Sequence, residues 1–188
     1  MEKNKANIKL NVFTSADEVL HHLAEYFVYL AGQAIEAKGR FSVALSGGNS
    51  PKKLYELLAS NAFKERIAWD KVVFFFGDER YVPQTAPESN YLMAKTALFD
   101  PLQIASTHVF PVDTSLEPAQ AAQAYATNIQ AFFNGEQARF DLVLLGLGDN
   151  AHTASLFPHT PVLHEQASTV KEVFLEDQQV YRITLTAP

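Results

Sequence analysis

The sequence predicts an α/β fold, a doubly wound, mainly parallel sheet with helices on both faces. Strand-like and helix-like segments alternate along the chain, as in folds whose strands are joined by crossover helices. Several strand-like runs are apolar at every position, residues 72–76 among them, as strands buried on both faces are. The chain has 188 residues, which is the length of one domain and enough to bury a core.

The apolar periodicity places the elements in order. After Ser15, apolar residues recur every three or four positions, which predicts a long amphipathic helix, and Ser15 with Glu18 has the spacing of a capping box. Further helices are expected over residues 51–58, 89–98 and 118–133. Strands are expected over residues 8–13, 41–45, 72–76, 108–112, 140–145, 170–175 and 180–186. Because little chain follows the last strand, we expect a single domain over residues 1–188 that lacks its C-terminal strand or helix.

Composition and charge exclude several classes of protein. The formal net charge of -6 and the pI of about 5.5 argue against a sequence-independent nucleic-acid binder, which is normally basic. The absence of cysteine excludes disulfides, thiol nucleophiles and cysteine-based zinc sites, and it suits a reducing cytoplasm. Residues 1–5 lead into no apolar secretory signal, and every apolar run is too short for a membrane span. We therefore expect a cytoplasmic protein, a monomer or weak dimer, with neither nucleic acid nor membrane as partner.

Ligands of doubly wound sheets bind at the carboxyl ends of the strands, which selects three loops, at residues 46–51, 77–83 and 146–158. The first loop contains Ser46, Gly47, Gly48, Asn49 and Ser50 and runs into Pro51. Its glycines allow a close approach of the backbone, and the proline suits the first turn of a helix. The N–H groups at that helix start would face a bound phosphate. The alternative is a tight turn with a helix N-cap.

The second loop places three charged residues, Asp78, Glu79 and Arg80, directly after a buried strand. Charges at such a place are costly unless they pair with one another or contact a ligand. Arg80 offers a planar guanidinium to a phosphate or carboxylate, and Asp78 and Glu79 would hold that group or bind sugar hydroxyls. The alternative is a structural cluster of ion pairs.

The third loop carries His152 shortly after two glycines. Histidine is the side chain best suited to proton transfer near neutral pH, and Asp149 or Asn150 would orient its ring. His152, His159 and His164 match the spacing of no usual metal site, so we expect no metal. The chain lacks a complete dinucleotide fingerprint and a nucleotide-binding P-loop, so we expect no nucleotide cofactor.

Taken together, the loops resemble those of the 6-phosphogluconolactonase family. The matching segments are ALSGGNSP at residues 44–51, FGDERYVP at 76–83 with Ser89 and Asn90, LGLGDNAHTASLFP at 145–158 and RITLT at 182–186. The order and spacing agree from about Ser15 to the end of the chain, and four motifs in register are specific. The resemblance implies the sugar-phosphate isomerase-like fold that the family shares with glucosamine-6-phosphate deaminase.

The resemblance also implies an activity, the hydrolysis of 6-phospho-D-glucono-1,5-lactone to 6-phospho-D-gluconate in the oxidative pentose phosphate pathway, without a metal or organic cofactor. His152 would then be the base that activates a water. The residues implied to bind the phosphosugar lactone are Ser46, Gly47, Gly48, Asn49, Asp78, Arg80 and Arg182.

The chain departs from the family pattern where the family reads Asp-Gly-His and this sequence reads Asn150-Ala151-His152. Asn150 accepts a hydrogen bond but cannot stabilise an imidazolium by charge, and Asp149 is offset by one residue. Ala151 disfavours a positive φ. Two other functions stay open. One is a glucosamine-6-phosphate deaminase or isomerase, with Asp78 as the base at the substrate C2, and the other is a non-catalytic sugar-phosphate sensor.

Overall fold

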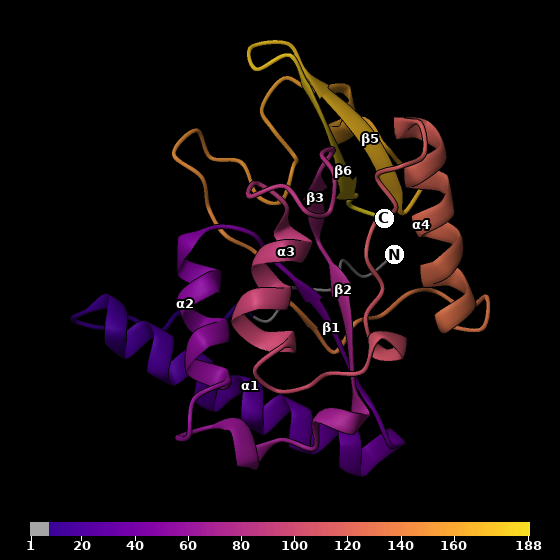
Figure 1. Ribbon diagram of the computed structural model, residues 1–188. Coiled ribbons are helices and arrows are strands. Elements are labelled where there is room, and N and C mark those ends of the chain that lie inside the picture. Colours follow the sequence, from indigo (N-terminus) through magenta and orange to yellow (C-terminus); the bar gives the residue numbers. More distant parts are fainter. Residues whose placement is uncertain (1–7) are drawn as a thin grey trace.

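Two small sheets form the frame of the molecule (Figure 1). The structure is a computed structural model, and it describes residues 8–188. The first sheet is parallel, in the order β2-β1-β4, and contains β1 (Phe41–Leu45), β2 (Val72–Phe76) and β4 (Leu142–Val143). The second is antiparallel, in the order β3-β6-β5, and contains β3 (Asp78–Arg80), β5 (Val170–Leu175) and β6 (Val180–Leu185). Only Gly77 separates β2 from β3, so the first sheet leads directly into the second.

Helices cover both faces of the first sheet (Figure 1). The helices are α1 (Ala16–Lys38), α2 (Asn49–Leu58), α3 (Asn90–Ala94) with a π-helical continuation over Lys95–Phe99, and α4 (Pro118–Phe132). Short 3-10 turns lie over Lys64–Arg66, Trp69–Lys71, Ser106–His108 and Pro161–His164. Val43 of β1 packs into the core with α1, α2 and α3, whereas its neighbour Ala44 packs into the core under α4. Since successive side chains of a strand point to opposite faces, every residue of β1 is buried.

The predicted fold class is confirmed, and most predicted elements lie where the apolar periodicity places them. The strand over 41–45, the strand over 72–76 and the long helix after Ser15 are all present. The predicted helix over residues 89–98 is interrupted, because its second half winds as a π-helix. The strands expected over residues 170–175 and 180–186 are also present, as β5 and β6, but the sequence did not predict their antiparallel pairing with each other and with β3.

Several strand predictions are wrong, in whole or in part. Residues 8–13 form no strand, and Ile8, Leu10 and Val12 are exposed. Within residues 108–112 there is only an isolated bridge between Val109 and Phe74, so the predicted strand there is absent. The strand expected over 140–145 is reduced to β4, with two residues. Conversely, residues 78–80, which were expected to lie in a loop, form the strand β3, because their backbone pairs with β6.

The first helix begins as the sequence predicts, with one difference in its cap. The Ser15 side chain accepts a hydrogen bond from the Glu18 N–H at 3.2 Å, which satisfies one of the free donors of the first turn. The Glu18 carboxylate, however, turns to the N–H and hydroxyl of Thr14, at 2.9 and 2.8 Å, instead of to Ser15. Gly39 ends the helix in the left-handed region at φ 78.

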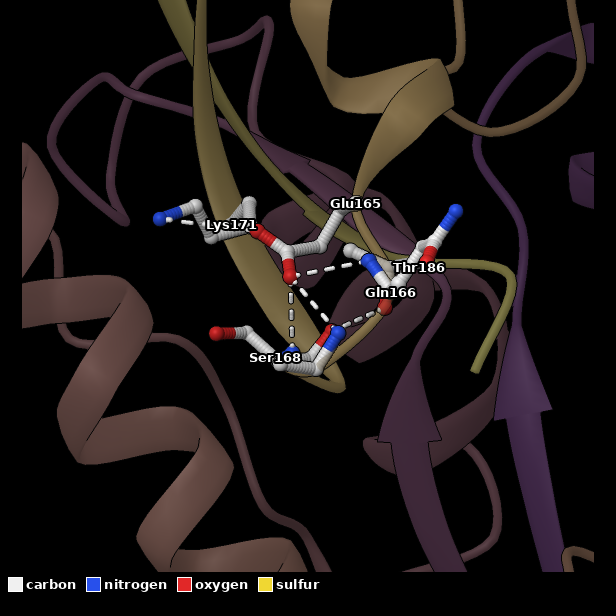
Figure 2. A network of polar contacts seen from close by, with 6 residues as sticks. Glu165, Gln166, Ser168, Lys171 and Thr186 are labelled. Atoms are coloured by element: carbon white, nitrogen blue, oxygen red, sulfur yellow. Dashed lines mark hydrogen bonds and ion pairs between the residues drawn. The ribbon is translucent and has the colours of Figure 1, made fainter.

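A polar network joins residues 165–168, which precede β5, to the second sheet (Figure 2). The Glu165 carboxylate accepts hydrogen bonds from the backbone N–H groups of Gln166 and Ser168 at 3.0 and 2.9 Å, and Lys171 of β5 lies 3.8 Å from its second oxygen. These bonds to the backbone N–H groups hold the pKa of Glu165 below its usual value. The Thr186 hydroxyl donates to the Ser168 carbonyl, which ties the segment to the end of β6.

None of the helices within residues 8–188 combines the length and the apolar character that crossing a lipid bilayer requires. Residues 1–5, which the sequence analysis considered for a secretory signal, lie outside the described part of the chain.

Candidate active site

One open cavity of about 440 Å³ lies at the carboxyl ends of β1 and β2, where the first sheet meets β3 and β6. All three loops selected from the sequence contribute to its wall. The predicted site residues that line it are Ser46, Gly47, Gly48, Asn49, Asp78, Arg80, His152 and Arg182. The structure therefore brings these eight predicted site residues together, whereas Asp149 and Asn150 are exposed and do not line the cavity.

The first loop presents the beginning of α2 to the cavity. Gly48 precedes the helix with φ 102, a conformation that side chains rarely adopt, and no side chain caps the helix there. The first turn of α2 holds no acidic residue, so its free N–H groups and positive end face the cavity without a negative charge from that turn. Gly47 lies against Asn90, since a Cβ at this position would be 2.0 Å from the Asn90 Oδ1. Gly47 is thus required by the local packing, and Gly48 by its backbone conformation.

Asp78 is a buried acid in the floor of the cavity. Its carboxylate accepts a hydrogen bond from the Ser155 hydroxyl at 2.7 Å, and the Asn90 amide nitrogen donates to its backbone carbonyl at 2.9 Å. Burial raises the pKa of the Asp78 carboxyl above its usual value, although the Ser155 hydroxyl and the charge of Arg80 act in the opposite direction. The side chain joins the second loop to the third through Ser155.

Glu79 faces away from the cavity and serves the fold. Its carboxylate accepts hydrogen bonds from the backbone N–H groups of Asn90 and Tyr91, at 2.7 and 2.8 Å, and from that of Arg80 at 2.8 Å. It therefore holds the beginning of α3 against β3. These contacts support a structural role for the Glu79 carboxylate.

Arg80 and Arg182 are direct neighbours on the paired strands β3 and β6, and both line the cavity. Arg80 donates to the Glu88 carbonyl at 2.5 Å, and Arg182 donates to the side-chain oxygen of Gln178 at 3.2 Å. Among the ion pairs of residues 8–188, none includes either arginine. Burial and the nearby charge of Arg80 lower the pKa of Arg182. Two adjacent guanidinium groups that form no ion pair within the described residues are chemically suited to an anion.

The third loop fixes the ring of His152. Its Nδ1 lies 2.5 Å from the Asn150 Oδ1, and its ring stacks on Phe157 with centroids 4.1 Å apart and an interplanar angle of 18°. Gly148 lies under the ring, because a Cβ there would be 2.0 Å from the imidazole Cε1. Ala151 adopts φ 62, the positive φ that the sequence analysis considered unfavourable for alanine.

Asp149 and Asn150 were alternative orienting residues for His152, and the geometry favours Asn150. Asp149 is exposed, and in the described part of the chain the ring hydrogen-bonds to Asn150 and not to Asp149. Because the amide oxygen of Asn150 is an acceptor, this contact favours the tautomer of His152 with the proton on Nδ1 and the lone pair on Nε2. Within residues 8–188, no three or more His, Asp or Glu side chains gather in a way that would hold a metal ion.

Two residues of the cavity wall, Asn90 and Ser155, were not predicted as site residues. In the sequence, Asn90 stands out only as part of a matching motif and near the expected beginning of a helix. Asn90 and Ser155 lie 12 and 77 residues from Asp78 in the sequence, and no local pattern predicts contacts over such separations.

Comparisons with known proteins agree with this geometry. The sequence profile of the family described as glucosamine-6-phosphate isomerases/6-phosphogluconolactonase matches residues 14–188. A 6-phosphogluconolactonase of Nostoc sp. is 49% identical over 134 residues, which are 69% of this chain and 54% of the relative. A 6-phosphogluconolactonase of Synechocystis sp. is 47% identical over 135 residues, which are 70% of this chain and 55% of the relative. The chain thus spans about half the length of these curated relatives.

Solved structures give the same result for the fold. The 6-phosphogluconolactonase from Trypanosoma cruzi superposes with a TM-score of 0.83 at 34% identity, over 95% of this chain and 74% of that one. The enzyme from Thermotoga maritima superposes with a TM-score of 0.77 at 32% identity, over 89% of this chain and 72% of that one. Since the family profile covers nearly the whole sequence, the chain belongs to the glucosamine-6-phosphate isomerase/6-phosphogluconolactonase family.

Proposed function

We propose that the cavity binds 6-phospho-D-glucono-1,5-lactone and hydrolyses it to 6-phospho-D-gluconate, with His152 as the general base. The observation that carries this proposal is that the oriented imidazole of His152 and the free arginine pair line one cavity. The relatives with the highest identity reported above are named 6-phosphogluconolactonases, which supports the same substrate.

The proposed reaction needs one proton acceptor and a firm hold on the substrate. The Nε2 of His152 takes a proton from a water while the water oxygen attacks the lactone carbonyl carbon. The tetrahedral intermediate then collapses, the bond from that carbon to the ring oxygen breaks, and the imidazolium returns its proton to the ring oxygen. The products are a free hydroxyl and a carboxylic acid, which releases its remaining proton to the solvent and becomes the carboxylate, and His152 is regenerated as a neutral base.

The substrate phosphate is assigned to the positive side of the cavity. Arg80 and Arg182 offer guanidinium groups without a carboxylate partner in the described residues, and the open beginning of α2 adds backbone N–H donors. Asp78 is suited to accept hydrogen bonds from sugar hydroxyls. Binding at both ends would place the carbonyl carbon near His152, and such positioning accounts for much of the rate of an intrinsically reactive ester.

The second candidate is an aldose-ketose isomerisation or deamination of glucosamine 6-phosphate, which the family description also includes. The observation in its favour is Asp78, a buried carboxylate in the cavity with a raised pKa, as a carbon-acid base requires. Against it, the carboxylate already accepts the Ser155 hydroxyl at 2.7 Å.

The test compares two substrates and two variants. We expect the purified chain to hydrolyse the lactone above the spontaneous rate and to release no ammonia from glucosamine 6-phosphate. His152→Ala should lower kcat by about 100-fold or more, as loss of a general base does, with little change in KM. Loss of ammonia release in Asp78→Asn would instead support the isomerase. Tight binding of 6-phosphogluconate without turnover of either substrate would support the sensor.

A further inference from the structure

Two buried tyrosines make the same unusual contact at the ends of two neighbouring strands. The Tyr55 hydroxyl accepts a hydrogen bond from the Ser46 N–H at 3.0 Å and donates one to the Ser46 carbonyl at 2.8 Å. The Tyr125 hydroxyl accepts one from the Phe76 N–H at 2.6 Å and donates one to the Phe76 carbonyl at 3.1 Å. Each hydroxyl therefore serves both polar groups of a single backbone residue.

Each contact lies where the pairing of the sheet ends. β1 pairs with β2 up to Leu45 and Phe76, and with β4 only up to Ala44 and Val143. Ser46 follows directly, so its peptide groups lie beyond the ladder in a buried environment. A buried peptide group without a hydrogen-bond partner destabilises the folded state, and each tyrosine hydroxyl satisfies two such groups at once.

The tyrosines come from opposite faces of the sheet. Tyr55 belongs to α2, and Tyr125 belongs to α4, on the other side of β1 and β2. Both side chains are buried, and burial raises the pKa of both hydroxyls, so they remain protonated donors. The two contacts are thus independent of each other and matched in geometry.

Each anchored residue is followed directly by a part of the cavity wall. Ser46 leads into Gly47 and Gly48, which have no side chains to fix them, and Phe76 leads through Gly77 into Asp78. A glycine-rich turn keeps its place only if the residue before it is held. A displacement of about 1 Å in a substrate-binding group is enough to weaken its contacts severely.

We propose that Tyr55 and Tyr125 are positioning residues, which hold the ends of β1 and β2 so that the loop over residues 46–49 and the strand β3 keep the spacing that the substrate requires. This inference rests on the proposed function for its kinetic part, and the structural part stands by itself. Neither residue touches the substrate in this scheme, because neither lines the cavity.

The experiment compares Tyr55→Phe and Tyr125→Phe with a control at the opposite end of β1. Ser42 is buried there, and its hydroxyl also accepts one hydrogen bond, from the Asp141 N–H at 3.2 Å, and donates one, to the Asp141 carboxylate at 2.8 Å. Ser42→Ala therefore also removes one accepted and one donated hydrogen bond, at the end of β1 that is away from the cavity.

The first readout is amide hydrogen exchange under native conditions. Tyr55→Phe should speed exchange over residues 46–50 and leave residues 77–81 unchanged, and Tyr125→Phe should give the reverse. We expect Ser42→Ala to change neither segment. Equal exchange at both loops in all three variants would overturn the proposal, and because each tyrosine reports on its own loop, one variant suffices if the other does not fold.

The second readout is the division between KM and kcat for lactone hydrolysis. Each phenylalanine variant should raise KM by about 3- to 10-fold, with kcat within about twofold of the parent, since the binding groups and not the base are displaced. KM values no higher than that of Ser42→Ala would show that the tyrosines serve stability alone. If the parent chain hydrolyses no lactone, the proposed function fails, and the exchange pattern still decides whether the tyrosines hold the loops.

Discussion

At the scale of single residues, the pair of Asn150 and His152 decides how the proposed base is tuned. The Asn150 Oδ1 lies 2.5 Å from the ring Nδ1, so it favours one tautomer, but a neutral amide does little to stabilise a positive ring. Ala151 between them adopts φ 62, which costs about 1 kcal/mol in an L residue other than glycine, asparagine or aspartate. The turn that aims the ring is therefore held by its surroundings.

Asn150→Asp tests this tuning. A carboxylate beside the ring favours the charged imidazolium over the neutral imidazole. Because the base acts in its neutral form, the acidic limb of the kcat/KM profile should move to higher pH. Measuring kcat/KM from pH 5 to 8 checks this, and Asp149→Asn, which alters an exposed neighbour, should leave the limb in place. An unmoved limb in Asn150→Asp would contradict the contact.

Asp78 provides a second prediction, on stability. Burial raises its pKa in the folded protein, so the folded state holds the proton to higher pH than the unfolded chain does. Between the unfolded value of about 4 and the raised native value, the folded state therefore binds more protons, and its stability falls as the pH rises. Asp78→Asn removes this pH-dependent loss of stability, so the stability of the variant relative to that of the parent should increase as the pH rises above about 4.

The matched control for Asp78 has the opposite sign. Hydrogen bonds from Thr14 lower the pKa of Glu18, so Glu18 contributes stability above its unfolded pKa and loses it as the pH falls through the native value. Glu18→Gln should therefore lose stability relative to the parent as the pH rises from 3 to 5. Urea unfolding at a series of pH values measures both differences in the free energy of unfolding. If this free energy changed with pH in the same way in the parent and in Asp78→Asn, the raised pKa of Asp78 would be contradicted.

At the scale of elements, the sequence predicted what local periodicity encodes and missed what depends on distant pairing. The strands β1 and β2 and the helix α1 follow from apolar spacing alone. Residues 8–13 alternate as a strand does but find no partner strand within residues 8–188, and β3 has a loop-like composition yet pairs with β6. Register across about a hundred residues is a property of the assembled chain, which one-dimensional patterns do not contain.

The third loop offers a prediction at this scale, because its shape depends on one small residue. Gly148→Ala would place a Cβ 2.0 Å from the His152 ring, so the ring must move. We expect kcat to fall by about 10-fold or more, since general-base catalysis is sensitive to geometry, while thermal stability changes little. Gly32→Ala in α1 is the control, because a Cβ there meets nothing within 4 Å. Equal kcat values for the two variants would contradict the packing of Gly148 against the ring.

At the scale of the whole molecule, the site arises where two sheets meet. The rule that ligands bind at the carboxyl ends of parallel strands was enough to predict that three loops share one rim. It was not enough to predict that β6 returns antiparallel and sets Arg182 beside Arg80, or that Ser155 reaches Asp78. The sequence motif of Arg182 indicated a contact, and the position of that contact came from the fold.

The arginine pair also explains how a chain with a formal net charge of -6 would bind an anion. The local guanidinium groups dominate at short range, since more distant charges are screened beyond about 8 Å in physiological salt. Arg182→Gln should therefore raise KM for the phosphorylated lactone by about 10-fold or more, with a smaller change in kcat. With glucono-1,5-lactone, which has no phosphate, the same variant should differ little from the parent.

Arg66→Gln is the control for this prediction. Arg66 does not line the cavity and pairs with Glu25 at 2.6 Å. Its substitution lowers the net charge by the same amount as Arg182→Gln does, so it tests the effect of net charge on substrate binding without the local contact. Its KM should equal that of the parent. If Arg66→Gln raised KM as much as Arg182→Gln did, net charge would govern substrate capture. If Arg182→Gln weakened both lactones equally, the arginine would hold the sugar ring or the carbonyl oxygen and not the phosphate.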